Sequence, residues 1–411
     1  MHFLPLMLAT AVAQVQAAIP LPADSARLAG HWTGAAERDG RTWRIVLDLR
    51  RGNDGELIAR FDLPDAGLYG VRAAATAGDG TLRLRTSSRR PIEIHAVQRA
   101  DTLSGTFPVG RLSAPFILVR GVGEPETVEE REVAFTSGTA RLVGTLVRPR
   151  AAGKVPVVVW THGSGLFTRD VDPNLSRAHL LARRGVASFV YDRRGHGASS
   201  GDSSPMLPFA ILAGDARAAI AAVRATPGID ARRVAVAGLS QGTWYLPMLA
   251  AGDPGIRAVV GIGTPGVSPG EQDLWLFERR LRARGLTAAD IADSLRARES
   301  ANVAELDAAL RDGAFHSFDA TVHWRRVRAP VLLLWGAEDA VVPVVESRER
   351  IVQALADGGN RAVAVHVLPN ADHPLNRARG PGEPWDFPRQ ADGVADLLAD
   401  WLRDRLGAAG P

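Results

Sequence analysis

Two hydrophobic patterns divide the chain. Between about residues 29 and 120, short segments alternate apolar and polar positions, as in RTWRIVLDLRR (41–51), and turns such as GNDG and AGDG separate them. A period of two predicts strands with one buried face, and short strands at this spacing are typical of a small meander barrel or a sandwich. We therefore expect an all-β domain over residues 19–124, with a linker at GEPET (123–127).

After residue 125 continuous apolar runs alternate with helical segments. A hairpin pattern at 133–149 comes first, and runs such as VPVVVW and APVLLLW then lack polar alternation, as expected of strands covered on both faces. This alternation predicts an α/β fold with a mostly parallel, doubly wound sheet over residues 125–411. The expected strands of this sheet lie at 155–163, 186–192, 232–240, 256–263, 329–336 and 362–369.

One segment interrupts the alternation. Between about residues 266 and 329 the chain shows helical patterns at 271–285, 288–300 and 303–313 with no strand among them, which predicts an inserted helical cap. Leu274, Trp275 and Phe277 form an apolar stripe on the first of these helices. We expect the stripe to pack on the body of the α/β domain.

The N-terminus resembles an export signal. Residues 1–18 hold a short apolar stretch that ends in small residues, with Val15 and Ala17 at the positions preceding a cleavage site. The alternative is a buried N-terminal strand or helix. The pattern predicts a periplasmic or secreted protein, and no later run approaches about 20 apolar residues, so stable membrane insertion is not expected.

Composition excludes several functions. The chain has no cysteine, which rules out disulfides, thiolate metal sites and a cysteine nucleophile. It has 49 Lys and Arg residues and 45 Asp and Glu residues, which gives a net charge of +4. The basic residues are scattered among acidic ones. Nucleic-acid binding is therefore not expected. The oligomeric state is not readable from these features.

The stretch GLSQG (238–242) lies where an expected strand turns into an expected helix. A residue at the apex of such a turn is exposed above the sheet, and flanking glycines relieve the crowding of the backbone. Ser240 is at the apex, between Gly238 and Gly242. The alternative is an ordinary serine N-cap. The context favours a nucleophile at a helix N-terminus, where partial positive charge stabilises a developing anion.

A serine nucleophile needs a base, and a histidine base needs a carboxylate. Asp339 follows the expected strand 329–336 in a loop closed by a proline, and His373 follows the strand 362–369. Both lie beyond carboxyl ends of strands, in the chain order serine, acid, histidine that is expected for this fold. Glu338 is the alternative acid. Asp372 is interpreted as a loop hydrogen-bonder, and His366 as a core residue of its strand.

An oxyanion site is expected near the same edge. The turn in VVVWTHGSG allows backbone N–H groups near Ser164 and Gly165 to point at a substrate oxygen, and the N–H of Gln241 supplies the other donor. His162, in the same turn, is expected to brace the loop and not to act as the base.

From about residue 128 onward the chain resembles the α/β-hydrolases, and more narrowly bacterial serine esterases. The resemblance rests on HGSG followed by Arg169 and Asp170, on YDRRGHGASSGD, and on Pro247 seven residues after Ser240. Trp244 and Tyr245 depart from it, because smaller residues are usual after the elbow. The segment GHWTG…LSGTF…FILVR is similar to small β-domains fused ahead of such hydrolases.

The resemblance implies a serine hydrolase that cleaves small-molecule carboxylic esters through an acyl-enzyme, with Ser240, Asp339 and His373 as its triad. No metal and no organic cofactor is expected. A peptidase or aminopeptidase of the same fold is the first alternative, because the triad alone does not separate esters from amides. A binding protein with a vestigial hydrolase site is the second.

Overall fold

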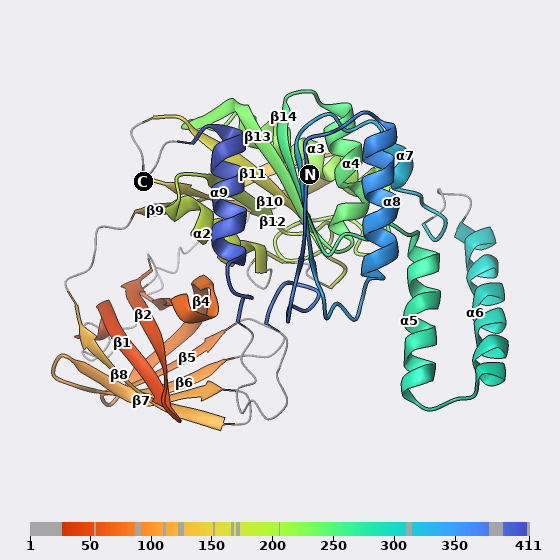
Figure 1. The fold of residues 1–411 in the computed structure, drawn as a ribbon. Helices are drawn as coiled ribbons and strands as arrows, with labels where there is room; N and C mark the ends of the chain where they lie inside the picture. The colour runs from red at the N-terminus through yellow and green to blue at the C-terminus, as the bar shows by residue number, and fades with distance from the viewer. Residues whose placement is uncertain are drawn as a thin grey trace, which may run out of the picture.

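The computed structural model describes residues 27–408, except 53–54, 87–91, 110–111, 122–126, 151–152, 166–167, 170–172, 205, 310–314 and 378–388. The expected signal peptide (1–18) and most of the expected linker (123–127) lie outside the described residues. The described residues form an N-terminal barrel and a C-terminal α/β unit (Figure 1).

Eight antiparallel strands close into a barrel because β1 pairs with β8 as well as with β2. A closed barrel leaves no unpaired edge, and it decides between the two architectures that the sequence left open. The strands are β1 (Gly30–Arg38), β2 (Arg41–Arg51), β3 (Leu57–Leu63), β4 (Leu68–Gly78), β5 (Thr81–Thr86), β6 (Glu93–Arg99), β7 (Thr102–Val109) and β8 (Leu112–Arg120), with a short 3-10 helix, η1 (Pro64–Ala66), between β3 and β4.

Alternating side chains fill the barrel interior. Leu47 and Leu49 on β2, Phe61 on β3 and Leu103 on β7 are all buried, and a cavity inside the barrel measures about 10 Å³. That is the size of a single water molecule at most, so the barrel is a packed core and not a binding pocket. The sequence pattern did not identify β4, because LYGVRAAATAG is rich in alanine and glycine and lacks a clear alternation.

The C-terminal unit is built on one eight-stranded sheet in the order β16-β15-β14-β13-β11-β12-β10-β9. Strands β9 and β10 form the expected antiparallel hairpin, and β10 is also antiparallel to β12. The remaining neighbours are parallel. This is the mostly parallel α/β sheet that the sequence predicted. The strands are β9 (Val128–Ser137), β10 (Ala140–Pro149), β11 (Val155–Thr161), β12 (Ala187–Tyr191), β13 (Ile229–Leu239), β14 (Ile256–Ile262), β15 (Val331–Gly336) and β16 (Val363–Leu368).

Helices cover both faces of this sheet, which explains the continuous apolar runs. Val157 and Val159 of β11 face one apolar cluster, and Val158 and Trp160 face the other. The first face is covered by α3 (Phe209–Arg224), α4 (Gly242–Gly252), α7 (Thr321–Trp324) and α8 (Val344–Asp357), and the second by α2 (Pro173–Arg183) and α9 (Val394–Leu406). None of the helices among the described residues is long and apolar enough to cross a membrane.

Two helices project from the body where the cap was expected: α5 (Pro269–Ala283) and α6 (Ala288–Ala309) (Figure 1). The second helical pattern of the sequence and the described part of the third (303–309) are one continuous helix, α6. The stripe on α5 does not pack on the body as predicted. The guanidinium carbon of Arg298 on α6 lies 5.7 Å from the centre of the Phe277 ring, and that of Arg279 on α5 lies 4.8 Å from the centre of the Trp275 ring.

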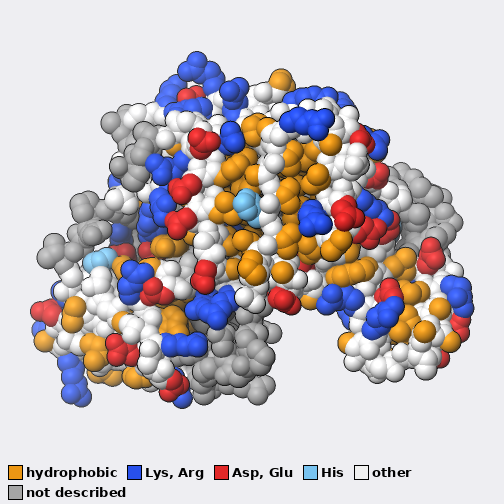
Figure 2. All heavy atoms as spheres, viewed as in Figure 1, with side chains coloured by type: hydrophobic (Ala, Val, Ile, Leu, Met, Phe, Trp, Pro, Cys, Tyr) orange, Lys and Arg blue, Asp and Glu red, His pale blue; other side chains and the backbone are white. Residues whose placement is uncertain are grey.

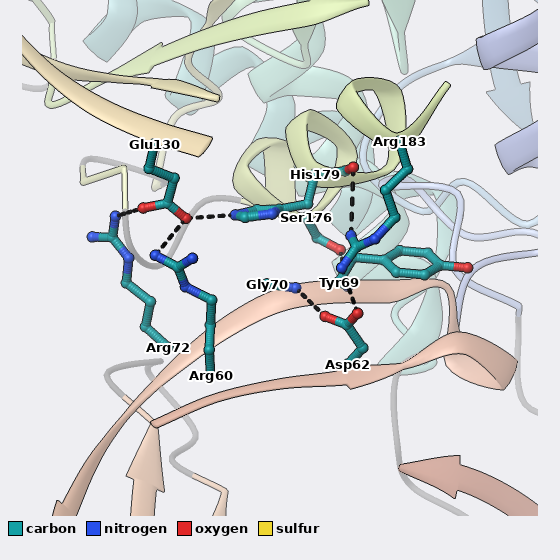
Figure 3. A network of polar contacts seen from close by, with 9 residues as sticks. All are labelled: Arg60, Asp62, Tyr69, Gly70, Arg72, Glu130, Ser176, His179 and Arg183. Carbon is teal, nitrogen blue, oxygen red and sulfur yellow. Dashed lines mark hydrogen bonds and ion pairs between the residues drawn. The ribbon is translucent and has the colours of Figure 1, made fainter. Parts of the chain in front are cut away.

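The barrel docks on the α/β unit through a buried carboxylate, Glu130 at the start of β9 (Figure 3). Its oxygens pair with Arg60 at 2.8 Å, with Arg72, and with Nε2 of His179 on α2 at 2.7 Å. Burial by itself raises the pKa of Glu130, but the His179 hydrogen bond and the two arginines outweigh it and bring that pKa to about 2. Glu130 is therefore ionised, and burial lowers the pKa of His179, so the histidine is neutral.

The same interface is closely packed. Gly70 on β4 has φ +64°, and a Cβ at this position would lie 2.2 Å from Cδ2 of His179. The Gly70 N–H donates to Asp62 at 2.6 Å, and the other oxygen of Asp62 accepts from Arg183 of α2 at 2.6 Å (Figure 3). Only glycine allows the barrel to approach α2 this closely.

The Glu130 carboxylate makes the stability of the folded protein depend on pH. Its folded pKa of about 2 lies below the ordinary 4.5, so its contribution is complete above about pH 4.5 and is lost as the pH falls toward 2. The shift corresponds to about 3 kcal/mol. Protonation of His179, whose folded pKa is also lowered, acts in the same direction at higher pH.

We expect Glu130→Gln to lower the free energy of unfolding at neutral pH and to flatten its decline in acid, measured by urea titration of tryptophan fluorescence. Glu93→Gln is the matched control, because Glu93 pairs with Arg85 on an exposed part of the barrel. It should keep the wild-type acid dependence. An unchanged acid dependence in Glu130→Gln would contradict the assignment.

Candidate active site

Ser240 occupies the sharp turn between β13 and α4. Its φ of +53° is in the left-handed region that residues other than glycine seldom adopt. The Ser240 N–H donates to the carbonyl of Ile262 at the end of β14 (2.9 Å), and its carbonyl accepts from the N–H of Thr243 in α4 (2.8 Å). The turn is thus held by two neighbouring elements, and its hydroxyl lies at the start of α4.

Crowding around Thr161 explains both glycines of the elbow. A Cβ at Gly238 would lie 2.3 Å from Oγ1 of Thr161, and one at Gly242 would lie 2.6 Å from the same oxygen. Gly242 is also backed by main chain, since its Cβ would meet the carbonyl oxygen of His162 at 2.7 Å. The end of β11 therefore approaches the elbow closely enough to exclude any side chain at these two positions.

Asp339 and His373 are in direct contact. Oδ2 of Asp339 accepts a hydrogen bond from Nδ1 of His373 at 2.7 Å, and Oδ1 accepts from the N–H groups of Val341 (2.8 Å) and Val342 (2.9 Å). The carboxylate is fully buried, while the imidazole is 14% exposed. Because a carboxylate only accepts, Nδ1 carries the proton and Nε2 keeps its lone pair, as a general base requires.

The histidine and the serine are both positioned by the end of β14. Gly263, with φ +53°, lies against the imidazole, since a Cβ there would be 2.8 Å from Nδ1 and Cε1 of His373. The preceding residue, Ile262, holds the Ser240 N–H. Nε2 of His373 is buried without a hydrogen-bond partner among the described residues. Ser240 and His373 therefore both contact the end of β14 but are not hydrogen-bonded to each other here. Such bonds often form only when substrate binds.

The alternatives to these residues lie elsewhere. Glu338 is exposed, and the Asp372 carboxylate accepts from the Asn376 N–H at 2.7 Å, within its own loop. Burial raises the pKa of Asp372. The prediction of His366 as a core residue is wrong: it is exposed on β16, the edge strand of the sheet, whose outer face at this position is not covered.

The three expected oxyanion donors differ in their surroundings. Gln241 lies at the N-terminus of α4, immediately after Ser240, and its side-chain oxygen accepts from Arg193 at 2.9 Å. Ser164 lies in the turn after β11. The N–H of Gly165 donates to the carbonyl of Gly163 at 3.1 Å, so it is used within the turn in this structure. Of the three expected donors, Gly165 is therefore the one whose N–H this turn already uses.

His162 is a structural residue of the same turn. Its Nε2 donates to the carbonyl oxygen of Tyr191 on β12, and its ring packs edge-on against the Tyr191 ring, with centroids 4.4 Å apart. Burial lowers the pKa of His162 to about 4, against the opposing effect of this hydrogen bond. A neutral imidazole with this bond joins β11 to β12 below the site.

Arg193 was not recognised from the sequence as part of the site. It is 2% exposed, and besides Gln241 it donates to the carbonyl of Ser204 at 3.3 Å. The motif YDRRGHGASSGD contains it, but arginine is seldom buried, so its type and position favour a surface residue. Its contact with the side chain next to the nucleophile is visible only in three dimensions.

Trp244 and Tyr245, the departures from the esterase pattern, belong to the core. Both are at most 5% exposed, and Nε1 of Trp244 donates to the carbonyl of Val267 ahead of α5 at 2.8 Å. Phe209 of α3 packs against both rings. The bulky pair thus ties α4 to the base of the projecting helices.

The candidate site lies at the carboxyl edge of the sheet, near two projecting parts of the molecule. The barrel contacts α2, which follows the loop after β11, and α5 follows the loop after β14, so both flank the carboxyl edge of the sheet. Figure 2 shows the molecule hollowed between the barrel and the α5–α6 pair. Among the described residues no three His, Asp or Glu side chains are grouped as a metal ion would require.

Comparison with known proteins identifies relatives of the α/β unit. A family model described as the alpha/beta hydrolase family matches residues 158–403. The quorum-quenching protein AidA of Acinetobacter baumannii (strain MDR-ZJ06) is 32% identical over 129 residues, which is 31% of this chain and 42% of that protein. The match thus spans less than half of that relative.

Several solved structures are similar to this chain at low sequence identity. A dienelactone hydrolase-like promiscuous phosphotriesterase from metagenomic libraries is 19% identical with a TM-score of 0.44, and covers 69% of this chain and all of its own. A dienelactone hydrolase from Anabaena variabilis is 19% identical with a TM-score of 0.43, over 68% of this chain and 99% of that one. An esterase of Pyrococcus furiosus is 19% identical with a TM-score of 0.44, over 62% and 87%.

The crowding at the elbow gives a testable prediction. Gly242→Ala should destabilise the protein by about 1–3 kcal/mol, because the added methyl group meets fixed main-chain atoms of β11. Gly252→Ala, at the other end of α4, is the control, since a Cβ there meets nothing within 4 Å. Thermal unfolding of both variants makes the comparison. Equal stability of the two would show that the elbow is not crowded as described.

Proposed function

Because the chain belongs to the α/β-hydrolase family, we propose that it hydrolyses carboxylic esters through an acyl-enzyme formed on Ser240. The observation that carries the proposal is the pair of Asp339 and His373, joined at 2.7 Å, with Nε2 left as a base. That base lies at the end of β14, the strand end that also holds the strained turn of Ser240. The family and the geometry together support a hydrolase whose nucleophile is a hydroxyl.

The first half of the reaction forms the acyl-enzyme. Nε2 of His373 takes the proton of the Ser240 hydroxyl as the oxygen attacks the ester carbonyl, and the carbonyl oxygen becomes an anion. The N–H groups of Gln241 and Ser164 donate to that anion, aided by the partial positive charge at the N-terminus of α4. When the intermediate collapses, the alcohol leaves with the proton that His373 holds.

The second half releases the acid. Water attacks the acyl-enzyme, and Nε2 of His373 takes its proton as the second oxyanion forms. Collapse then expels Ser240 Oγ, which regains the proton from His373. Asp339 remains ionised throughout, since its buried carboxylate is held by two backbone N–H groups and stabilises the imidazolium of His373.

Ester and amide substrates share this chemistry, so the peptidase alternative is tested directly. Parallel assays with p-nitrophenyl esters of increasing acyl length and with aminoacyl anilides compare the two classes. The proposal predicts turnover of esters well above that of anilides, and Ser240→Ala should abolish both. Preferential cleavage of the anilides would replace esterase by peptidase activity at the same site.

Substitution of Asp339 should cause a large loss of kcat. We expect Asp339→Asn to lower kcat by about 10⁴-fold, because the amide favours the wrong tautomer of His373. The control is Glu338→Gln, the exposed neighbouring carboxylate, which should leave kcat within about twofold of wild type. Steady-state hydrolysis of a p-nitrophenyl ester measures both. Equal losses in the two variants, or none in Asp339→Asn, would contradict the assigned roles.

A further inference from the structure

The first connection between the barrel and the loop after β16 that carries His373 (the histidine loop) runs through helix α2. Three of its residues face the barrel (Figure 3): Ser176 accepts the Tyr69 N–H of β4 at 2.8 Å, and Arg183 donates to Asp62 of β3 at 2.6 Å. His179 bonds Glu130 of β9, the carboxylate that also holds Arg60 and Arg72 of the barrel. Their spacing of three and four residues puts them on one side of the helix. One side of α2 is thus attached to strands β3 and β4 of the barrel, directly and through Glu130.

The adjacent side of α2 contacts the histidine loop. Nη2 of Arg177 donates to the carbonyl oxygen of Pro374, the residue after His373, at 2.7 Å. Nη1 of the same guanidinium donates to the side chain of Asn174, one turn earlier on α2, at 3.0 Å. Arg177 is 5% exposed, so its position is fixed by both contacts. One helix therefore connects the barrel to the main chain at the catalytic base.

A second connection does not involve α2. The carbonyl of Ala66, in the η1 turn of the barrel, accepts the N–H of Gln390 at 2.8 Å. Gln390 pairs in turn with Asn376, and the next residue, Ala391, donates to the carbonyl of Leu375 at 2.9 Å. The residues two and three positions after His373 are therefore paired with a segment that is itself anchored to the barrel.

We propose that the barrel is a positioning domain for the catalytic histidine. Through Arg177 and through Gln390 it fixes the main chain of residues 374–376, and thereby keeps the imidazole of His373 aligned between Asp339 and Ser240. The proposal rests on the proposed function of His373. Arg177 is its principal positioning residue, because it touches the loop and not the reacting atoms.

Among the described residues the imidazole makes one hydrogen bond, to Asp339, and it also packs against Gly263. Its alignment therefore depends on the main chain that carries it. Leu375, two residues later, has φ +65°, a strained conformation that is held by its own N–H bond to the Asp372 carbonyl at 3.0 Å and by the Ala391 N–H bond to its carbonyl. Base catalysis depends steeply on placement, since a shift of about 1 Å costs up to roughly 100-fold in rate.

The first arm of the test removes the contact of α2 with the loop. Arg177→Ala should lower kcat by roughly tenfold with KM little changed, and Arg177→Lys should restore most of it, because a lysine still donates to the Pro374 carbonyl. Arg184→Ala is the control, since Arg184 pairs with Asp396 on α9. Wild-type kcat in Arg177→Ala, or a loss that Arg184→Ala reproduces, would overturn the role of Arg177.

The second arm loosens the barrel itself. Hydrogen exchange of peptides covering residues 371–377 is compared in wild type, Glu130→Gln and the milder Ser176→Ala, with Glu93→Gln as the control. The proposal predicts faster exchange in 371–377 and a lower kcat in the first two, and neither change in the control. Faster exchange confined to 68–72 and 176–183 would overturn it. If Glu130→Gln does not fold, Ser176→Ala decides.

The two proposals fail in different ways. If the wild-type protein neither hydrolyses esters nor reacts with a fluorophosphonate at Ser240, the proposed function is wrong, while the exchange comparison still shows whether the barrel holds the loop. If the wild type is active and exchange in 371–377 is independent of the barrel contacts, the positioning domain is wrong and the esterase remains.

Discussion

The left-handed turn at Ser240 is the constraint on which the site depends. A serine with φ +53° carries a strain of about 1–3 kcal/mol, and three neighbouring elements hold it there. Thr161 at the end of β11 crowds Gly238 and Gly242, the Ile262 carbonyl of β14 takes the serine N–H, and α4 begins directly afterwards. Because these elements meet only when the parallel sheet has formed, the nucleophile is created by the fold and not by its own loop.

The other residues of the site are held by contacts that lie progressively farther from that turn. Asp339 is fixed by backbone N–H groups of its own loop, and it orients His373 directly. The loop that carries His373 is held by hydrogen bonds within residues 371–377 and also receives contacts from α2 and from the segment at Gln390. Those contacts lead to the barrel, where the ionised Glu130 holds two arginines and His179. The placement of the His373 imidazole is thereby linked to the packing of the barrel against the α/β unit.

Sequence reasoning located the features that depend on local chemistry. Ser240, Asp339 and His373 each follow an apolar strand, so their common edge was predictable from strand ends alone, and the mostly parallel α/β sheet follows from the continuous apolar runs. What it could not supply depends on long-range packing. The exposure of His366 follows from β16 being an edge strand, the missed strand β4 from its small residues, and the role of Arg177 from a contact 197 residues away in the chain. The use of the Gly165 N–H within its own turn is likewise a matter of geometry that composition does not encode.

The most direct test of the account is a crystal structure of the protein after reaction with a fluorophosphonate. The account predicts phosphorus bonded to Oγ of Ser240, a phosphoryl oxygen within about 3 Å of the Gln241 N–H, and Nε2 of His373 turned toward the modified oxygen. A reagent attached to another residue, or an adduct on Ser240 with the His373 imidazole turned away and its bond to Asp339 broken, would contradict it.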